Sequence, residues 1–195
     1  MLLMMTKNRI HSVGANFAVL SVRLGYLLLC LHLAACLHSN AARAQGAERK
    51  AGTVTGLPLP RFVSLKSDEV NARVGPGGDY AIAWVFRRPG LPVEIIAEFE
   101  SWRQIRDSEG GTGWVAASLL SGKRTALVAP WIKKKTLFKL SSSRDGSAIV
   151  AEMEPGTIVD VANCDGASCE VYAANRKGWV QQNDLWGVYP GEKVN

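Results

Sequence analysis

Short apolar runs recur along the chain from residue 61 onward, and each is bounded by Gly, Pro, Asp or Ser. They are rich in β-branched and aromatic residues, which favour strands over helices. No stretch shows a convincing helical periodicity. Short strands at this spacing predict an all-β protein built as a small barrel or sandwich. The runs lie at 62–65, 70–74, 82–87, 93–97, 102–106 and 113–115.

This pattern occurs twice. A Pro-Gly pair at 89–90 returns at 155–156, and a Gly-Trp-Val run at 113–115 returns at 178–180, offsets of 66 and 65 residues. Two copies of one fold explain the repeat. We place the first barrel at 61–120, a degenerate second barrel at 126–186 and a C-terminal tail at 187–195. Units of roughly 60 residues bury a limited fraction of their surface, so we expect the two barrels to pack together.

The N-terminal segment has a different pattern, with basic residues before an apolar run at 24–37 and the small-x-small residues Ala42 and Ala44 behind it. This order is typical of a secretory signal peptide, and it predicts a leader at 1–44 that is cleaved after Ala44. The protein is then periplasmic or secreted.

Two other interpretations of the leader stay open. Leu33-Ala34-Ala35-Cys36 resembles the lipobox of bacterial lipoproteins, which would place a lipid on Cys36. The apolar run could also remain as an uncleaved anchor helix. We expect membrane association only in these two cases.

Residues 45–60 lack apolar periodicity and consist mostly of Ala, Gly, Lys, Thr and Pro. This composition predicts a flexible linker that ends in an extended piece. Its Leu-Pro-Leu-Pro end is a stiff spacer in this interpretation; the alternative is a polyproline ligand.

Cleavage after Ala44 changes the charge. It removes four of the 23 basic residues and none of the 17 acidic residues, so the net charge falls from +6 to +2. This small positive charge gives little support for binding to nucleic acid, and we expect no nucleic-acid partner. The dense basic run at 133–135 is then a solvated loop edge or, alternatively, a contact for an anionic wall polymer.

The sequence gives little support for an enzyme activity. All three histidines lie within the leader, so the mature chain has no Ser-His or Cys-His relay and no imidazole for zinc. Glu94, Glu98 and Glu100 alternate along a strand, which predicts a solvated face rather than two carboxylates converging in a cleft. We therefore expect no enzyme activity, no cofactor and no metal site.

A tight loop follows the strand at 70–74. Gly75, Pro76 and Gly77 suit a sharp turn with positive φ at glycine, so we expect them to shape the loop by backbone geometry. Tyr80 and Trp84 border this loop and are candidates for a ligand groove, with packing under the loop as the alternative. The repeated tryptophans Trp114 and Trp179 are expected in or near the barrel cores.

Five separate points in the first copy resemble the bacterial SH3 (SH3b) signature: Asn71-x-Arg73-x-Gly75-Pro76, Tyr80, the Pro-Gly turn, Trp102 and Gly113-Trp114-Val115. The second copy has Leu-Phe-Lys-Leu-Ser-Ser-Ser at 137–143 in place of the first element. It resembles the degenerate repeats paired in small exported alphaproteobacterial proteins. The resemblance implies a bent barrel of five to seven strands in each copy, and binding to cell-wall peptides or tethering of an enzyme to the wall.

Cys164 and Cys169 flank an Asp-Gly pair, which is a strong hairpin-turn signal. The two thiols would lie across the hairpin, and in an exported protein this predicts a structural disulfide. Closing so short a loop stabilises the fold by about 2 kcal/mol in the chain-entropy model.

Two functions follow from these patterns. The first is an exported, non-catalytic binding module that recognises cell-wall (peptidoglycan) peptides. The second copy lacks the glycine loop, which suggests that the first copy retains it for binding. The candidate contact residues of this module are Asn71, Arg73, Tyr80, Trp84 and Trp102. The second function is a periplasmic protein–protein interaction scaffold that presents Trp131, Trp186 and residues 188–190 to an envelope protein.

Overall fold

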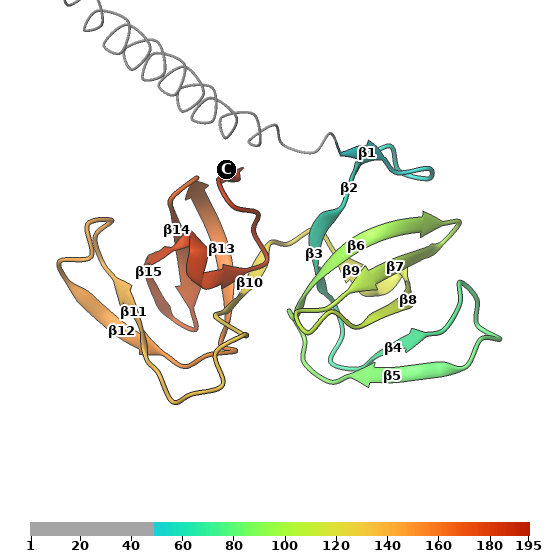
Figure 1. Ribbon diagram of the computed structural model, residues 1–195, viewed down its shortest axis with the longest axis horizontal. Helices are drawn as coiled ribbons and strands as arrows, with labels where there is room; N and C mark the ends of the chain where they lie inside the picture. The colour runs from blue at the N-terminus through green and yellow to red at the C-terminus, as the bar shows by residue number, and fades with distance from the viewer. Residues whose placement is uncertain (1–48) are drawn as a thin grey trace, which may run out of the picture. The chain divides into compact units, whose positions relative to one another are not determined.

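Two antiparallel sheets with matching strand order make up most of the molecule (Figure 1). The computed structural model describes residues 49–195, which form one compact unit. The predicted leader at 1–44 and its cleavage site lie outside the described residues. Within residues 49–195, no helix has the length and apolar character needed to cross a membrane.

The sheet of barrel 1 has seven strands in the order β5-β4-β8-β7-β6-β3-β9. A single 3-10 turn, η1, precedes its last strand. The elements are β3 (Arg61–Leu65), β4 (Val70–Arg73), β5 (Ile82–Phe86), β6 (Pro92–Phe99), β7 (Trp102–Arg106), β8 (Thr112–Ala116), η1 (Ala117–Leu119) and β9 (Leu120–Ser121).

The sheet of barrel 2 has the order β12-β11-β15-β14-β13-β10-β16, which matches barrel 1 strand for strand. This match confirms the predicted all-β fold with two tandem SH3-like copies. The elements are β10 (Thr125–Val128), β11 (Phe138–Ser141), β12 (Ile149–Met153), β13 (Ile158–Asp165), β14 (Ser168–Ala173), β15 (Arg176–Gln181), η2 (Gln182–Asp184), β16 (Leu185–Trp186) and β17 (Lys193–Val194).

Each barrel also carries bulges at equivalent places. In barrel 1 the register shifts between Ala72 and Arg73 and between Ile95 and Ala97. In barrel 2 it shifts between Leu140 and Ser141 and again on β13 at 161–163. A bulge adds one residue to a strand, bends it and moves the following side chains to the other face. The bulges therefore curl both sheets in the same way.

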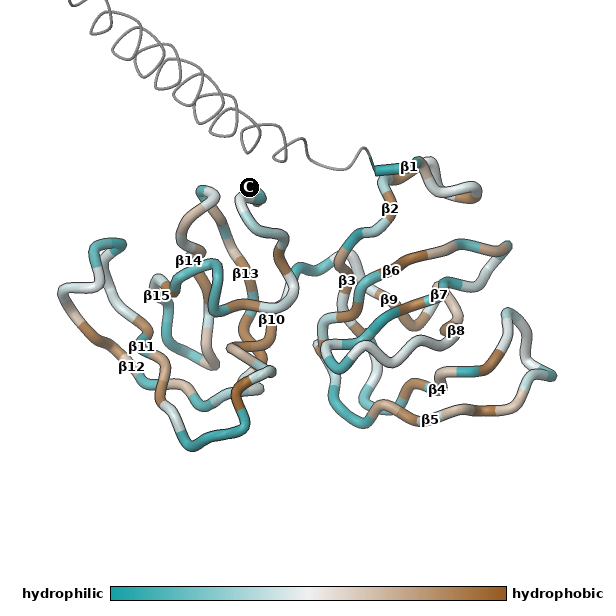
Figure 2. The backbone as a smooth tube through the Cα atoms, in the orientation of Figure 1, coloured by the Kyte–Doolittle hydropathy of each residue, from teal (hydrophilic) through white to brown (hydrophobic). Residues whose placement is uncertain are grey.

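Each barrel has its own apolar core, formed by the inward-facing positions of its strands. The tube in Figure 2 shows hydrophobic positions on the strands and mostly hydrophilic loops. Burial of each such aliphatic side chain stabilises the fold by about 2 kcal/mol. The core of barrel 1 consists of Leu65, Val70, Ala72, Val93, Ile95, Ile105 and Val115. The core of barrel 2 includes Val128, Leu140, Met153, Val159, Val171 and both cysteines.

The segment predicted as a flexible linker is ordered from residue 49 onward. Strands β1 (Lys50–Ala51) and β2 (Pro58–Leu59) pair as a small hairpin, which we call the N-terminal hairpin. Its turn binds the side chain of Glu98, as described below. The C-terminal tail is ordered too, because β17 pairs with the end of β13. Composition alone indicates neither strand pair.

The two barrels contact each other, as their small size led us to expect. Phe62 of barrel 1 packs against Trp186 and Tyr189, with ring centroids 5.0 and 4.7 Å apart. The Tyr189 hydroxyl donates to Glu94 Oε1 at 2.8 Å, and Arg88 donates to the Gly156 carbonyl at 3.2 Å.

Candidate functional site

One face of barrel 1 gathers three of the five predicted contact residues. Arg73 on β4 lies directly opposite Trp114 on β8, and Trp114 lies opposite Gln104 on β7. Directly opposed residues in antiparallel strands share a face, and alternate residues along one strand do too. Asn71 and Trp102 therefore point the same way as this row. We call these five residues, Asn71, Arg73, Trp102, Gln104 and Trp114, the outer face of barrel 1.

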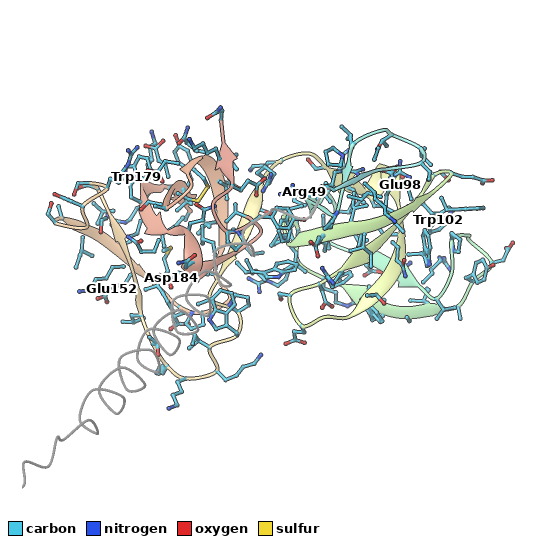
Figure 3. The ribbon with its side chains drawn as sticks, turned by 45° about the horizontal axis from the view of Figure 1, so that its top comes forward. Arg49, Glu98, Trp102, Glu152, Trp179 and Asp184 are labelled. Atoms are coloured by element: carbon cyan, nitrogen blue, oxygen red, sulfur yellow. A yellow bond between two sulfur atoms is a disulfide. The ribbon has the colours of Figure 1, made fainter. Side chains whose placement is uncertain are left out.

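All five residues of the outer face are partly exposed, while their neighbours Ala72, Arg103, Ile105, Gly113 and Val115 are buried. This alternation shows that the sheet has its core on one side only. Figure 3 shows Trp102 on the sheet of barrel 1. Gln104 had no signal in the sequence beyond its place in a short strand. Trp114 was expected in or near the core, but the register puts it on the outer face.

The glycine loop is organised by Arg73 and Tyr80. Arg73 Nη1 donates to the Tyr80 carbonyl at 2.6 Å, which closes the loop, and the exposed Tyr80 ring lies over Gly75 and Gly77. None of the three loop glycines has positive φ, so the prediction of left-handed turns here is wrong. A Cβ at Gly75 would overlap the Tyr80 ring, so a larger residue there displaces the ring.

Trp84 does not share a face of the sheet with the other candidate contact residues. It lies opposite Ala72, a core residue, and its ring packs edge-on to Phe86 with centroids 6.3 Å apart. It therefore faces the core of barrel 1, on the opposite side of the sheet from Asn71 and Arg73. Of the two aromatics that border the loop, only Tyr80 stands exposed; Trp84 takes the alternative role of packing beneath.

The equivalent face of barrel 2 is partly covered by the protein's own side chains, beside a hollow of about 330 Å³ that Trp179 and Arg144 line. Trp179 corresponds to Trp114, and the guanidinium of Arg144 lies 4.3 Å from the centre of its ring. Arg144 Nε is in turn 3.3 Å from Asp165 Oδ2. Hydrogen bonds from the Ser168 and Ala167 amides, with the Arg144 charge, lower the pKa of Asp165. Next to it, Lys177 Nζ pairs with Glu170 Oε1 at 2.8 Å.

Two glutamates expected on a solvated face are buried instead. The bulge between Ile95 and Ala97 puts Glu94 and Glu98 on opposite faces of β6, opposite Arg106 and Arg103. Tyr189 covers Glu94 and the N-terminal hairpin covers Glu98, so their exposed fractions are 4% and 8%. The expectation failed because it assumed a regular strand with one uncovered face.

Glu98 is the anchor of the N-terminal hairpin. Its carboxylate accepts hydrogen bonds from the Val54 and Thr55 amides at 3.0 and 2.9 Å, from the Thr55 hydroxyl at 2.7 Å and from Arg61 Nη2 at 2.6 Å. Burial alone would raise the pKa of this carboxyl, but the bonds from Thr55, Arg61 and Val54 outweigh burial and lower it to about 2. Glu98 is therefore ionised at neutral pH.

The predicted disulfide is confirmed, and it takes the place of this ion pair in barrel 2. Cys164 and Cys169 are bonded across β13 and β14 and are buried. They occupy the cross-strand position that Glu98 and Arg103 occupy in barrel 1, just after the equivalent bulge. Strand β17 pairs with β13 beside the disulfide, with Val194 opposite Cys164.

The residues assigned to a protein scaffold are mostly used inside the molecule. Trp186 and Tyr189 pack on Phe62 and are half-buried, and Val188 is buried. Trp131 and Pro190 are exposed, Trp131 at 51%. The three lysines at 133–135 are exposed and line a hollow of about 560 Å³ with Arg88.

No group of three potential ligands among His, Cys, Asp and Glu comes together as a metal site within residues 49–195. The chemistry of the outer face is therefore that of aromatic rings, one guanidinium and two amides. Such groups bind by stacking and hydrogen bonding.

The comparisons with known proteins agree with this picture. The family model described as "Bacterial SH3 domain" matches twice, at residues 66–122 and 131–187. The chain belongs to the bacterial SH3 domain family. Domains of this family are cell-wall binding modules, and both of its matches here fall on the two barrels. The comparison with curated proteins found no match.

Three solved structures show a distant likeness. NlpC2 and NlpC1 from Trichomonas vaginalis are 14% and 15% identical, with TM-scores of 0.31 and 0.30 over 67% and 72% of this chain and 48% and 49% of theirs. An NlpC/P60 family protein from Bacillus cereus is 11% identical, with a TM-score of 0.29 over 64% of this chain and 55% of its own. This chain thus spans about half the length of these proteins.

Proposed function

We propose that this protein is an exported, non-catalytic module that binds cell-wall peptides through the outer face of barrel 1. The observation that carries the proposal is the contrast between the two repeats. In barrel 2 the tryptophan of the repeated Gly-Trp-Val run is covered by Arg144. Among residues 49–195, no cationic side chain lies over Trp114 or Trp102 of barrel 1. The two equivalent faces therefore differ in whether a cation is stacked on the tryptophan, although a hollow of about 330 Å³ also borders Trp179.

The groups of this face suit an extended peptide. Gln104 has both an amide donor and a carbonyl acceptor, which can pair with a peptide unit of a ligand. Trp102 and Trp114 supply rigid apolar surface on either side of it, and aromatic residues dominate binding energy at interfaces. Tyr80 stands at the end of this face on a loop that Arg73 holds closed.

A sedimentation assay with purified peptidoglycan sacculi tests the proposal. We expect the protein to pellet with sacculi, and Trp102→Ala or Gln104→Ala to weaken retention about tenfold, the loss typical of a central contact. Trp179→Ala, at the equivalent position of barrel 2, is the matched control and should leave retention unchanged. The proposal fails if the protein stays in the supernatant or if the control loses as much binding as the outer-face variants.

Removing the stem peptides with an amidase separates the peptide from the glycan as ligand. We expect the stripped glycan to release the protein. Retention on stripped glycan would refute peptide recognition even if binding to whole sacculi were strong.

Export is part of the proposal and rests on the leader pattern at 1–44. Intact mass of the protein recovered from outside the cytoplasm tests it. We expect a chain that starts at Gln45. A chain that starts at a lipidated Cys36 would show a lipoprotein, and an unprocessed mass in the cytoplasm would refute export.

A further inference from the structure

A second hollow, which we call the inter-barrel pocket, lies where the two barrels meet. It has a volume of about 520 Å³, within the range of small-molecule and side-chain sites. Trp131, Trp186 and Tyr189 give it aromatic walls, and Glu94, Arg106 and Gln182 are its main polar groups. None of the contacts assigned to the outer face uses this pocket.

One of the aromatic rings that line the pocket has no stacking partner among residues 49–195. Trp186 and Tyr189 are held by Phe62, and the guanidinium of Arg49 already lies 4.2 Å from the centre of the Tyr189 ring. Trp131 is 51% exposed, and no aromatic or cationic side chain of residues 49–195 stacks on it. An exposed indole at the rim of a hollow is the preferred partner of an organic cation.

The polar groups of the pocket favour a ligand that donates hydrogen bonds over a ligand that only accepts them. Glu94 Oε2 is paired with Arg106, but Oε1 accepts only the Tyr189 hydroxyl within the described residues, at 2.8 Å. A carboxylate oxygen can accept more than one hydrogen bond. Gln182 is 3% exposed, and its Oε1 is buried without any partner there, because its amide nitrogen is the atom bonded to the Tyr189 and Glu192 carbonyls.

The charges of the lining agree with the hydrogen bonding. The charged side chains of the lining are Glu94, Asp107 and Arg106, and the Arg49 guanidinium lies beside them over the Tyr189 ring. Burial, and then the Glu94 carboxylate, raise the pKa of Tyr189, which therefore stays a neutral donor. A cation with N–H donors and an apolar stem complements the carboxylates and the aromatic surface of such a lining.

We infer that the inter-barrel pocket binds a peptide side chain of the lysine type, an alkyl chain that ends in a primary ammonium. The ammonium lies over Trp131 and donates toward Glu94 Oε1, and the alkyl stem packs on Trp186. This site is separate from the outer face of barrel 1, so a cell-wall peptide and a lysine-type side chain can be bound independently.

Three capped tripeptides that differ only in the central residue test this inference. They carry lysine, norleucine and glutamate between alanines, and binding to the purified protein is followed by the indole N–H signals in NMR spectra. We expect the lysine peptide to shift the Trp131 signal and to bind about tenfold more tightly than norleucine, which lacks the ammonium. Equal binding of norleucine, or tighter binding of glutamate through Arg106, would overturn the inference.

Two variants locate the site. Trp131→Ala should weaken the lysine peptide about tenfold and leave the urea midpoint of unfolding unchanged, because the side chain is exposed and unstacked. Glu94→Gln should weaken it as well, with correct folding checked by the unchanged indole signals of Trp102 and Trp114. Trp102→Ala is the control that must not change lysine-peptide binding. Unchanged affinity in Trp131→Ala, or no binding of the lysine peptide at millimolar concentration, refutes the inference.

Discussion

Replacing Glu98 with glutamine tests how the N-terminal hairpin is held. The carboxylate is the point where the Val54 and Thr55 amides and the guanidinium of Arg61 meet. Arg103 Nε lies 3.5 Å from the same Oε1 atom. Glutamine keeps the size of the side chain but removes its charge. Both arginines then remain beside a neutral group in a buried place.

The expected loss is about 3 kcal/mol of unfolding free energy, at the lower end of what removal of one partner from a buried ion pair costs. The lowered pKa of Glu98 arises from the same hydrogen bonds and agrees in direction. Its fall from 4.5 to about 2 on folding corresponds to on the order of 3 kcal/mol. Against the total stability of about 5–15 kcal/mol for a typical protein, this is a large fraction.

Urea unfolding between pH 7 and pH 2.5 measures the effect and its origin. The pKa of Glu98 is lower in the folded state, so its contribution is present above about pH 4.5 and is lost as the pH falls toward 2. The gap between the wild type and Glu98→Gln should therefore close over this range. Faster amide exchange at Val54 and Thr55 in the variant would show that the hairpin is released first.

Glu100→Gln is the matched control, because Glu100 lies two residues away and is exposed. It should change the unfolding free energy by less than about 0.5 kcal/mol. The reasoning is refuted if Glu98→Gln behaves like this control, or if its deficit is the same at pH 7 and pH 2.5.

Three further changes probe the close contacts of the two barrels. Gly178→Ala places a Cβ 2.6 Å from the Ser141 carbonyl oxygen, so β11 and β15 must separate, and urea unfolding should show a loss of about 3 kcal/mol. Gly75→Ala pushes the Tyr80 ring away and should change its NMR signals with a stability loss below about 1 kcal/mol, because Tyr80 is exposed. Reduction of the disulfide should cost about 2 kcal/mol and lower the urea midpoint.

Each of these has a control in the same chain. Gly113→Ala, in barrel 1, meets the Ala72 Cβ at 3.0 Å and the Arg73 carbonyl oxygen and Trp84 ring at 3.4 Å, and should cost less than Gly178→Ala; an equal loss would contradict the geometry. Gly78→Ala points into open space and should leave the Tyr80 signals unchanged. Reductant should not change the unfolding of a variant with both cysteines replaced by alanine, and a further drop there would mean that the disulfide is not the cause.

The sequence was enough to predict the all-β fold, its duplication and the disulfide of the second copy. These depend on local patterns: strand-forming runs between turn residues, repeated Gly-Trp-Val and Pro-Gly markers, and two cysteines on either side of an Asp-Gly turn. Local preference and chain spacing decide such features, so they are visible before any contact is known.

Only the tertiary structure decided which side of the sheet each candidate faces. The bulge after Ile95 reverses the alternation, and strand pairing places Trp84 against the core while Trp114 turns outward. Neither effect can be predicted from the sequence of one strand, because the partner strand sets the register. The same holds for Glu98 and Glu94, which are buried only because the N-terminal hairpin and Tyr189 cover them. The loop at 75–80 is thus recognisable in the sequence, whereas the face it borders and the inter-barrel pocket exist only through contacts between distant residues.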